Sequence, residues 1–218
     1  MDPSPPIAPP PRPGLALLFD AFVAPARAYA TLAVRPQWWP AALIVVACIV
    51  AGNVLALPAE FHVLKTPRAP DLEIAVRIAL EVLPVVVTWG FLASIFVSLA
   101  PSEKRRYSTY FALAVVGSLP AGLATVLEGL ILRLHDPASF HSFAQIANAL
   151  PVSLAIFTPN AEPREVAFLS SFDLFGAWKL LFIAFGARAL GGIRPVVALV
   201  VGFSIDFAFA LTQVLQLP

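Results

Sequence analysis

The chain has 218 residues, of which 59% are hydrophobic and only 12% are charged, and its mean hydropathy is +0.85. Soluble domains are typically about 45–50% apolar and about 25% charged, so this composition excludes a cytoplasmic enzyme, a nucleic-acid-binding domain and a disordered chain. The net charge of +1 provides no overall field that would attract nucleic acid. A single cysteine, Cys48, excludes a disulfide within the chain and a zinc site built from cysteines. These properties predict an all-α integral membrane protein.

The N-terminal region divides into a tail and a membrane-surface segment. Residues 1–13 contain seven prolines and almost no large apolar side chains, which predicts a disordered, polyproline-like tail. We expect no cleaved signal peptide, because no continuous apolar run ends in a small-residue cleavage site. Residues 15–34, with Pro25 in the middle, predict one or two amphipathic helices lying on the membrane surface. The pair Trp38-Trp39 is typical of the lipid headgroup level.

Residues 14–218 are predicted to form a single membrane domain. A membrane-spanning helix needs about 20 mostly apolar residues, and five stretches satisfy this requirement, at about 39–59, 74–100, 107–132, 172–190 and 195–217. Residues 138–159 are apolar but interrupted by polar residues and proline. We interpret them as a re-entrant or interfacial segment buried against protein, with a sixth span as the alternative. The predicted fold is therefore a bundle of five transmembrane helices with an N-terminal interfacial helix.

The distribution of basic residues predicts how the chain is oriented. If the N-terminus is cytoplasmic, the inner segments carry eight Lys and Arg residues and the outer segments carry five. The positive-inside rule then places the N-terminus in the cytoplasm and the C-terminus outside, in the cytoplasmic (inner) membrane. A sixth span would move Arg188 and Arg194 to the outside, which argues against it.

Two charged residues within the fourth and fifth spans are predicted to pair. Lys179 precedes the Gly191-Gly192 turn by twelve or thirteen residues, and Asp206 follows it by fourteen or fifteen. At about 1.5 Å per residue, they lie within about 5 Å in height on adjacent antiparallel helices. An ionised residue in mid-membrane costs about 2.5–3.5 kcal/mol, so it needs a partner or a function. We expect a clamp between the two helices, with a proton or ion relay as the alternative.

A second charged cluster is predicted in the outer half of the membrane. Glu81 and Glu128 lie at similar distances from the turn that joins the second and third spans, and Arg77 and Arg133 lie near them in the sequence. We interpret the two glutamates as interfacial carboxylates paired with these arginines. The alternative is a cation or proton site of a transporter.

The spans also contain prolines and a stripe of small residues. Small side chains recur every fourth position in the third span, a pattern that allows close helix approach, so this helix should be central in the bundle or at a dimer interface. Prolines at similar depths in the second and third spans predict kinks, or backbone carbonyls open to a ligand. The residues are Gly117, Ala121, Thr125 and Gly129 for the stripe, and Pro84 and Pro120 for the prolines.

The sequence contains no recognisable catalytic, cofactor or metal motif. It lacks the glycine-rich phosphate and dinucleotide motifs, the Gly-x-Ser-x-Gly elbow and the His-Glu-x-x-His zinc helix. His135, Asp136 and His141 match no metal-binding template and are interpreted as polar loop residues. We therefore expect no catalytic residue, no cofactor and no metal.

Three segments carry a recognisable pattern: Phe19-Asp20 with Pro25, Tyr29 and Arg35–Pro40; Tyr107–Tyr110 with Gly117–Pro120; and Ser171–Leu181 with Gly186. Together they resemble the bacterial branch of the Yip family, the Ypt/Rab-interacting membrane proteins. The resemblance covers roughly residues 15–217 and implies a five-span domain with a cytoplasmic N-terminus. Lys179 departs from the pattern, since similar sequences more often have a small polar residue there. The eukaryotic role in membrane traffic is not carried over, because bacteria lack that pathway.

The resemblance implies a non-enzymatic membrane adaptor or organiser. Its partners would be the lipid bilayer and other membrane proteins or a second copy of the chain, with no nucleic acid. The alternative function is a small transporter or channel that uses the charged residues within the membrane. The sequence identifies neither a substrate nor a partner.

Overall fold

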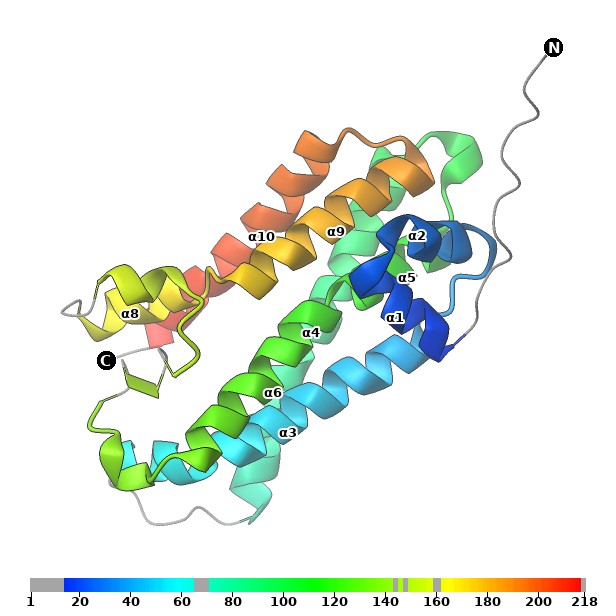
Figure 1. Cartoon of the computed structure of the whole chain (residues 1–218). Helices are drawn as coiled ribbons and strands as arrows, with labels where there is room; N and C mark the ends of the chain where they lie inside the picture. Colours follow the sequence, from blue (N-terminus) through cyan, green and yellow to red (C-terminus); the bar gives the residue numbers. More distant parts are fainter. Residues whose placement is uncertain (1–13, 65–70, 143–144, 147–148, 159–161, 217–218) are drawn as a thin grey trace.

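The computed structural model describes residues 14–64, 71–142, 145–146, 149–158 and 162–216 (Figure 1). The predicted tail at residues 1–13 lies outside the described residues. The described part is helical and contains five helical segments long and apolar enough to cross a membrane. The predicted all-α class with five spans is therefore confirmed. The spans run over Trp39–Val63, Leu72–Leu99, Tyr107–Leu134, Leu174–Gly191 and Pro195–Thr212.

The first two spans form helices α3 (Trp39–Leu64) and α4 (Asp71–Leu99). Both are longer toward their shared loop than the sequence analysis predicted, because the helices continue through charged residues beyond the apolar stretch. Glu60, which lies beyond the predicted end of the first span, is therefore part of α3, and Arg77 lies about one and a half turns inside α4. A short 3₁₀ turn, η1 (Ser102–Lys104), follows α4 and contains Lys104, and Arg105 and Arg106 follow it in the predicted cytoplasmic loop.

The third span consists of two helices, α5 (Tyr107–Gly117) and α6 (Leu119–Leu134), that meet at Ser118. Pro120 lies in the first turn of α6, where its missing N–H causes no loss, and this position explains the predicted interruption. The Trp89 indole donates a hydrogen bond of 2.9 Å to the Ser118 hydroxyl, which in turn donates to the Ala114 carbonyl. The junction is thus tied to α4 by a buried polar contact.

The last two spans, α9 (Leu174–Gly191) and α10 (Pro195–Gln216), form a hairpin. Gly192 ends α9 in the left-handed conformation with φ of 69°, and its N–H donates to the Arg188 carbonyl. A residue with a Cβ would be strained at this φ. The sequence analysis predicted that the glycine pair ends a helix, and this is confirmed.

The segment between α6 and α9 contains no membrane-spanning helix among its described residues. It includes the 3₁₀ turns η2 (Pro137–Ser139) and η3 (Leu154–Phe157) and the short helix α8 (Pro163–Ser170). Phe140 and Ile146 pack with Ala56, Ala59 and Leu132 in a small hydrophobic cluster at the ends of α3 and α6. The segment is thus packed against protein, as predicted. Helix α8 was not predicted, although its capping box, Glu162 with Glu165, is a sequence signal.

The N-terminal segment forms two short helices, α1 (Leu15–Val23) and α2 (Pro25–Val34), at the end of the bundle where α5 and α9 meet (Figure 1). Leu17 and Leu32 are fully buried, and the Tyr29 hydroxyl donates a 2.9 Å hydrogen bond to the Phe182 carbonyl of α9. This hairpin is therefore built into the main hydrophobic core and is not merely attached to the bundle by its linker.

Two groups of helices diverge from this end of the bundle (Figure 1). Helices α3, α4 and α6 form one group, and α8, α9 and α10 form the other. Helix α5 packs against both α4 and α9 and so joins the two groups. The core is consequently dense near the N-terminal hairpin, and space remains between the groups farther along.

Because Tyr29 is buried, we expect the stability of the protein to fall in alkaline solution. Burial raises the pKa of Tyr29 to about 12 from 10.0, so the unfolded chain releases this proton first as the pH rises. The stabilisation is complete below pH 10 and is lost as the pH approaches about 12, by about 2–3 kcal/mol. The free energy of unfolding of Tyr29→Phe, measured in the same lipid as that of the unmodified chain, should not show this alkaline loss. A Tyr29→Phe protein with the same alkaline loss would contradict the prediction.

Candidate functional site

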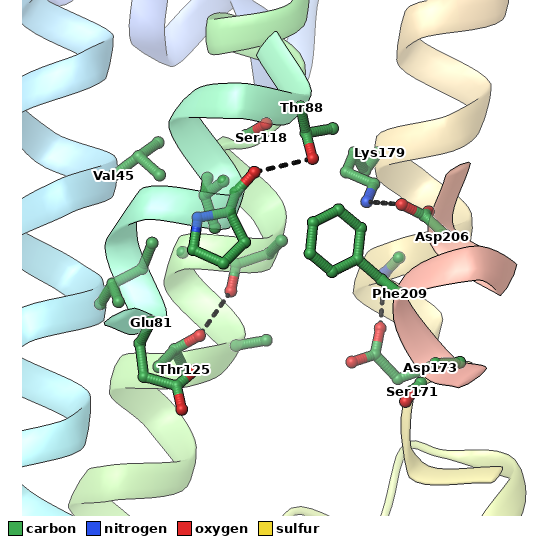
Figure 2. A pocket seen from close by; sticks show the side chains of 18 of the residues that line it. Val45, Glu81, Thr88, Ser118, Thr125, Ser171, Asp173, Lys179, Asp206 and Phe209 are labelled. Atoms are coloured by element: carbon green, nitrogen blue, oxygen red, sulfur yellow. Dashed lines mark hydrogen bonds and ion pairs between the residues drawn. The ribbon is translucent and has the colours of Figure 1, made fainter. Parts of the chain in front are cut away.

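A cavity of about 820 Å³ lies between the two helix groups. Figure 2 shows its walls, with α3, α4 and α6 on one side and α9 and α10 on the other. Binding pockets for small molecules typically measure about 300–1,000 Å³. The lining combines apolar residues such as Leu83 and Phe209 with polar and charged side chains contributed by both groups. The cavity is the candidate functional site, because it brings the charged residues of several spans together.

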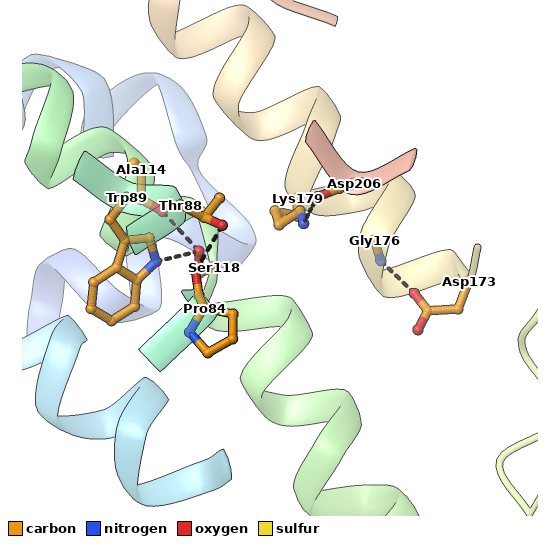
Figure 3. Close-up of polar contacts among 9 residues, drawn as sticks. All are labelled: Pro84, Thr88, Trp89, Ala114, Ser118, Asp173, Gly176, Lys179 and Asp206. Carbon is orange, nitrogen blue, oxygen red and sulfur yellow. Dashed lines mark hydrogen bonds and ion pairs between the residues drawn. The ribbon is translucent and has the colours of Figure 1, made fainter. Parts of the chain in front are cut away.

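Lys179 and Asp206 meet on one wall of the cavity. The Lys179 Nζ lies 2.7 Å from Asp206 Oδ1 (Figures 2 and 3). Both side chains are about one-fifth exposed, at 19% and 21%, and both line the cavity. The structure therefore brings the predicted pair into direct contact between α9 and α10. The pair neutralises its own charge, and a role in transport stays a prediction.

The second predicted cluster is arranged differently from the expectation. Arg77 pairs with Glu60 of α3 at 2.6 Å, not with Glu81 or Glu128. Within the described residues, Glu81 and Glu128 have neither an ion pair nor a hydrogen bond, although both line the cavity with Arg77. Arg133 is exposed near the end of α6 and is not part of the cavity lining. The prediction of arginine-paired glutamates was therefore wrong, because Glu60 takes the one arginine that reaches the cavity.

Asp173 is a lining residue that the sequence analysis did not select. It caps the N-terminus of α9, where its side chain accepts a hydrogen bond from the Gly176 N–H (Figures 2 and 3). An aspartate directly before an apolar helix is a recognisable N-cap signal. Burial raises the pKa of Asp173, while the hydrogen bond from Gly176 and the nearby charge of Lys179 lower it. The carboxylate thus lies at the cavity wall beside the start of the fourth span.

The wall opposite the ion pair is formed by polar groups of α4 and the α5–α6 junction. The Thr88 hydroxyl donates to the Pro84 carbonyl at 2.9 Å, and Ser118 lies close by (Figure 3). Pro84, Thr88 and Ser118 all line the cavity. The hydroxyls already have hydrogen-bond acceptors, so this wall offers a ligand mainly hydroxyl oxygen lone pairs and apolar surface.

Comparisons with known proteins agree with the membrane assignment. No family model matches the chain, and no solved structure matches it. A protein named "Membrane protein YknW" from Bacillus subtilis (strain 168) is 22% identical over 214 residues, covering 89% of this chain and 88% of that protein. The chain is a multi-pass integral membrane protein. The similarity extends over nearly the full length of both chains, so it concerns the whole membrane domain and not a local motif.

The Glu60–Arg77 pair could have been found by the height argument that found Lys179–Asp206. Glu60 lies four residues before the end of α3 and Arg77 six residues after the start of α4. The two residues therefore lie at similar heights on helices joined by one loop. The sequence analysis ended the first span before Glu60 and so assigned this residue to the loop.

Proposed function

We propose that the protein is a non-enzymatic adaptor or organiser of the cytoplasmic membrane that resembles the Yip family. The resemblance carried by Phe19–Pro40, Tyr107–Pro120 and Ser171–Gly186 supports this function, and the five spans agree with it. The partner would be another membrane protein or a second copy of the chain.

The observation that carries this proposal is the construction of the N-terminal hairpin. One face of α1 is buried in the core through Leu17 and Leu18, whereas Leu15, Phe19 and Val23 are 74%, 66% and 57% exposed. These three residues recur every four positions and therefore share one face of the helix. A rigidly held helix with an exposed apolar face at the membrane boundary provides a surface on which another membrane protein can pack.

A photo-crosslinking side chain at Phe19 tests this function. We expect a discrete crosslinked protein band in cells, because the exposed face of α1 would be covered by the partner. A crosslinker at Val87, which is 58% exposed on α4, is the matched control and should label lipid without a comparable band. Equal labelling patterns at both positions would contradict the adaptor function.

The orientation of the chain in the membrane can be tested separately with a reporter fusion. Because the loop around η1 and the α9–α10 turn carry the basic residues, we propose that the N-terminus is cytoplasmic and the C-terminus is outside. A reporter that requires export, fused after Pro218, should be active. A reporter active only in the cytoplasm at that position would contradict five spans with this orientation.

A small transporter is a second candidate function, favoured by the cavity and by Glu128 within it, which has no ion pair among the described residues. Ion or proton flux into liposomes should then fall in Glu128→Gln and stay unchanged in Glu103→Gln, whose carboxylate is exposed in η1 outside the cavity. Flux equal to that of empty liposomes would remove this candidate.

A further inference from the structure

The charges around the cavity do not balance. Of its cationic lining residues, Arg77 is paired with Glu60 and Lys179 with Asp206. The lining carboxylates Glu81, Glu128 and Asp173 have no ion pair with any described residue. Glu128 of α6 and Asp173 at the start of α9 thus contribute carboxylates from both helix groups to the same cavity. The cavity lining therefore has a surplus of negative charge between membrane spans, and a bound cation would offset it.

A buried hydroxyl in the same lining also lacks a partner. Ser153 is 5% exposed, and its Oγ has no hydrogen-bond partner in the described part of the chain. The residue lines the cavity and pairs through an isolated antiparallel bridge with Asp173. An unsatisfied buried polar group costs about 1–3 kcal/mol, so such groups are normally satisfied by a protein group, water or ligand. Ser153 thus indicates a polar ligand group beside Asp173.

The size and spacing of the site determine which kind of cation fits. Among the described residues, no three acidic, histidine or cysteine side chains come close enough together to hold one metal ion. The carboxylates are instead distributed around a volume of about 820 Å³. Phe209 also lines the cavity and is drawn beside the Lys179–Asp206 pair (Figure 2), and an aromatic ring can contribute a cation–π contact. This arrangement suits a larger cation with an apolar body.

We propose that the cavity binds an organic cation, an amine or onium compound with an apolar body, whose charge lies between Glu81, Glu128 and Asp173. The inference rests on the second candidate function only in treating the cavity as a ligand site. Binding does not require transport, and it is independent of the adaptor surface on α1.

Tetraphenylphosphonium is a suitable probe, and tetraphenylborate is an anion of nearly the same shape. The full chain in phosphatidylcholine nanodiscs should bind the phosphonium saturably above empty nanodiscs, and in separate samples the borate should not bind above its own empty-nanodisc background. Glu128→Gln should weaken binding at least about tenfold, because a charged contact is lost. Glu81→Gln should weaken it in the same direction, and Glu103→Gln is the matched control that should bind like the unmodified chain.

Thermal unfolding with and without the phosphonium shows whether each variant is folded. The compound should raise the Tm of the unmodified chain and of Glu103→Gln more than that of Glu128→Gln. No saturable binding, equal binding of the borate, or unchanged affinity in both Glu128→Gln and Glu81→Gln would overturn the inference. Phosphonium binding without flux in liposomes would remove the transporter function and leave the proposed cation site standing. Flux without phosphonium binding would overturn the proposed cation site and support the transporter function.

Discussion

Lys179→Met and Asp206→Asn should each destabilise the protein, and the double variant should recover much of the loss. Each single change strands one charge within the membrane, because the 2.7 Å contact joins α9 and α10 directly. Double-mutant cycles give interaction energies that average about 0.6 kcal/mol for polar pairs between membrane helices. For contacting residues in proteins generally, the interaction energies are about 0.5–3 kcal/mol. Since both side chains are only about one-fifth exposed, at 19% and 21%, we expect a measurable coupling energy within this range. Reversible unfolding in mixed micelles measures it through a double-mutant cycle.

The matched control combines Asp206→Asn with Arg188→Met. Arg188 is an exposed basic residue near the end of the same helix, α9, and the structure places it in the last turn, away from Asp206. These two changes should be additive within about 0.5 kcal/mol. Additive effects of the Lys179 and Asp206 changes would show that the contact does not stabilise the hairpin.

Gly129→Ala should be strongly destabilising, because α3 and α6 cross at this point with their backbones in contact. A Cβ on Gly129 would collide with the Gly52 carbonyl oxygen, and a Cβ on Gly52 would collide with the Thr125 carbonyl oxygen. Backbone atoms cannot move aside as a flexible side chain can. Overpacking costs about 1–3 kcal/mol and occasionally more, and we expect the upper end for Gly129→Ala and a larger loss for Gly129→Val.

Gly90→Ala is the control for the helical propensity of alanine. Gly90 lies within α4, and a Cβ there would come no closer than 3.5 Å to the Tyr107 hydroxyl, which is an ordinary contact. Alanine is favoured over glycine in a helix by about 1 kcal/mol, so Gly90→Ala should be neutral or stabilising in the same unfolding measurement. Similar stabilities for Gly129→Ala and Gly90→Ala would mean that the α3–α6 crossing is not tightly packed.

The small-residue stripe of the third span predicted that other helices approach closely, but not which helices they are. The pattern predicted close helix approach within the bundle or at a dimer interface, and the structure places Gly129 against α3 and Gly117 against Ile183 and Phe182 of α9. The matching glycine of α3, Gly52, lies in the first span and so outside this stripe. Its role depends on which helix faces it, and that is a property of the assembled bundle.

The sequence by itself determined the number of spans, the turn at Gly192 and the equal heights of Lys179 and Asp206. Each of these follows from the local chain: hydropathy gives span lengths, glycine permits positive φ, and a fixed rise per residue gives height along adjacent helices. The N-terminal surface segment also followed from its own composition, although its burial against Phe182 did not.

Only the tertiary structure decided which charged groups share the cavity and which have partners. Arg77 pairs with Glu60, so Glu128 has no ion pair with a described residue, and Ser153 and Asp173 join the lining from a segment between spans. Height along a helix can be counted from sequence, but the direction in which a side chain points around the axis relative to other helices cannot. That direction is set by the packing of residues far apart in the chain. Here it is set by the close crossing of α3 and α6 and by the divergence of the α9–α10 hairpin from the group formed by α3, α4 and α6.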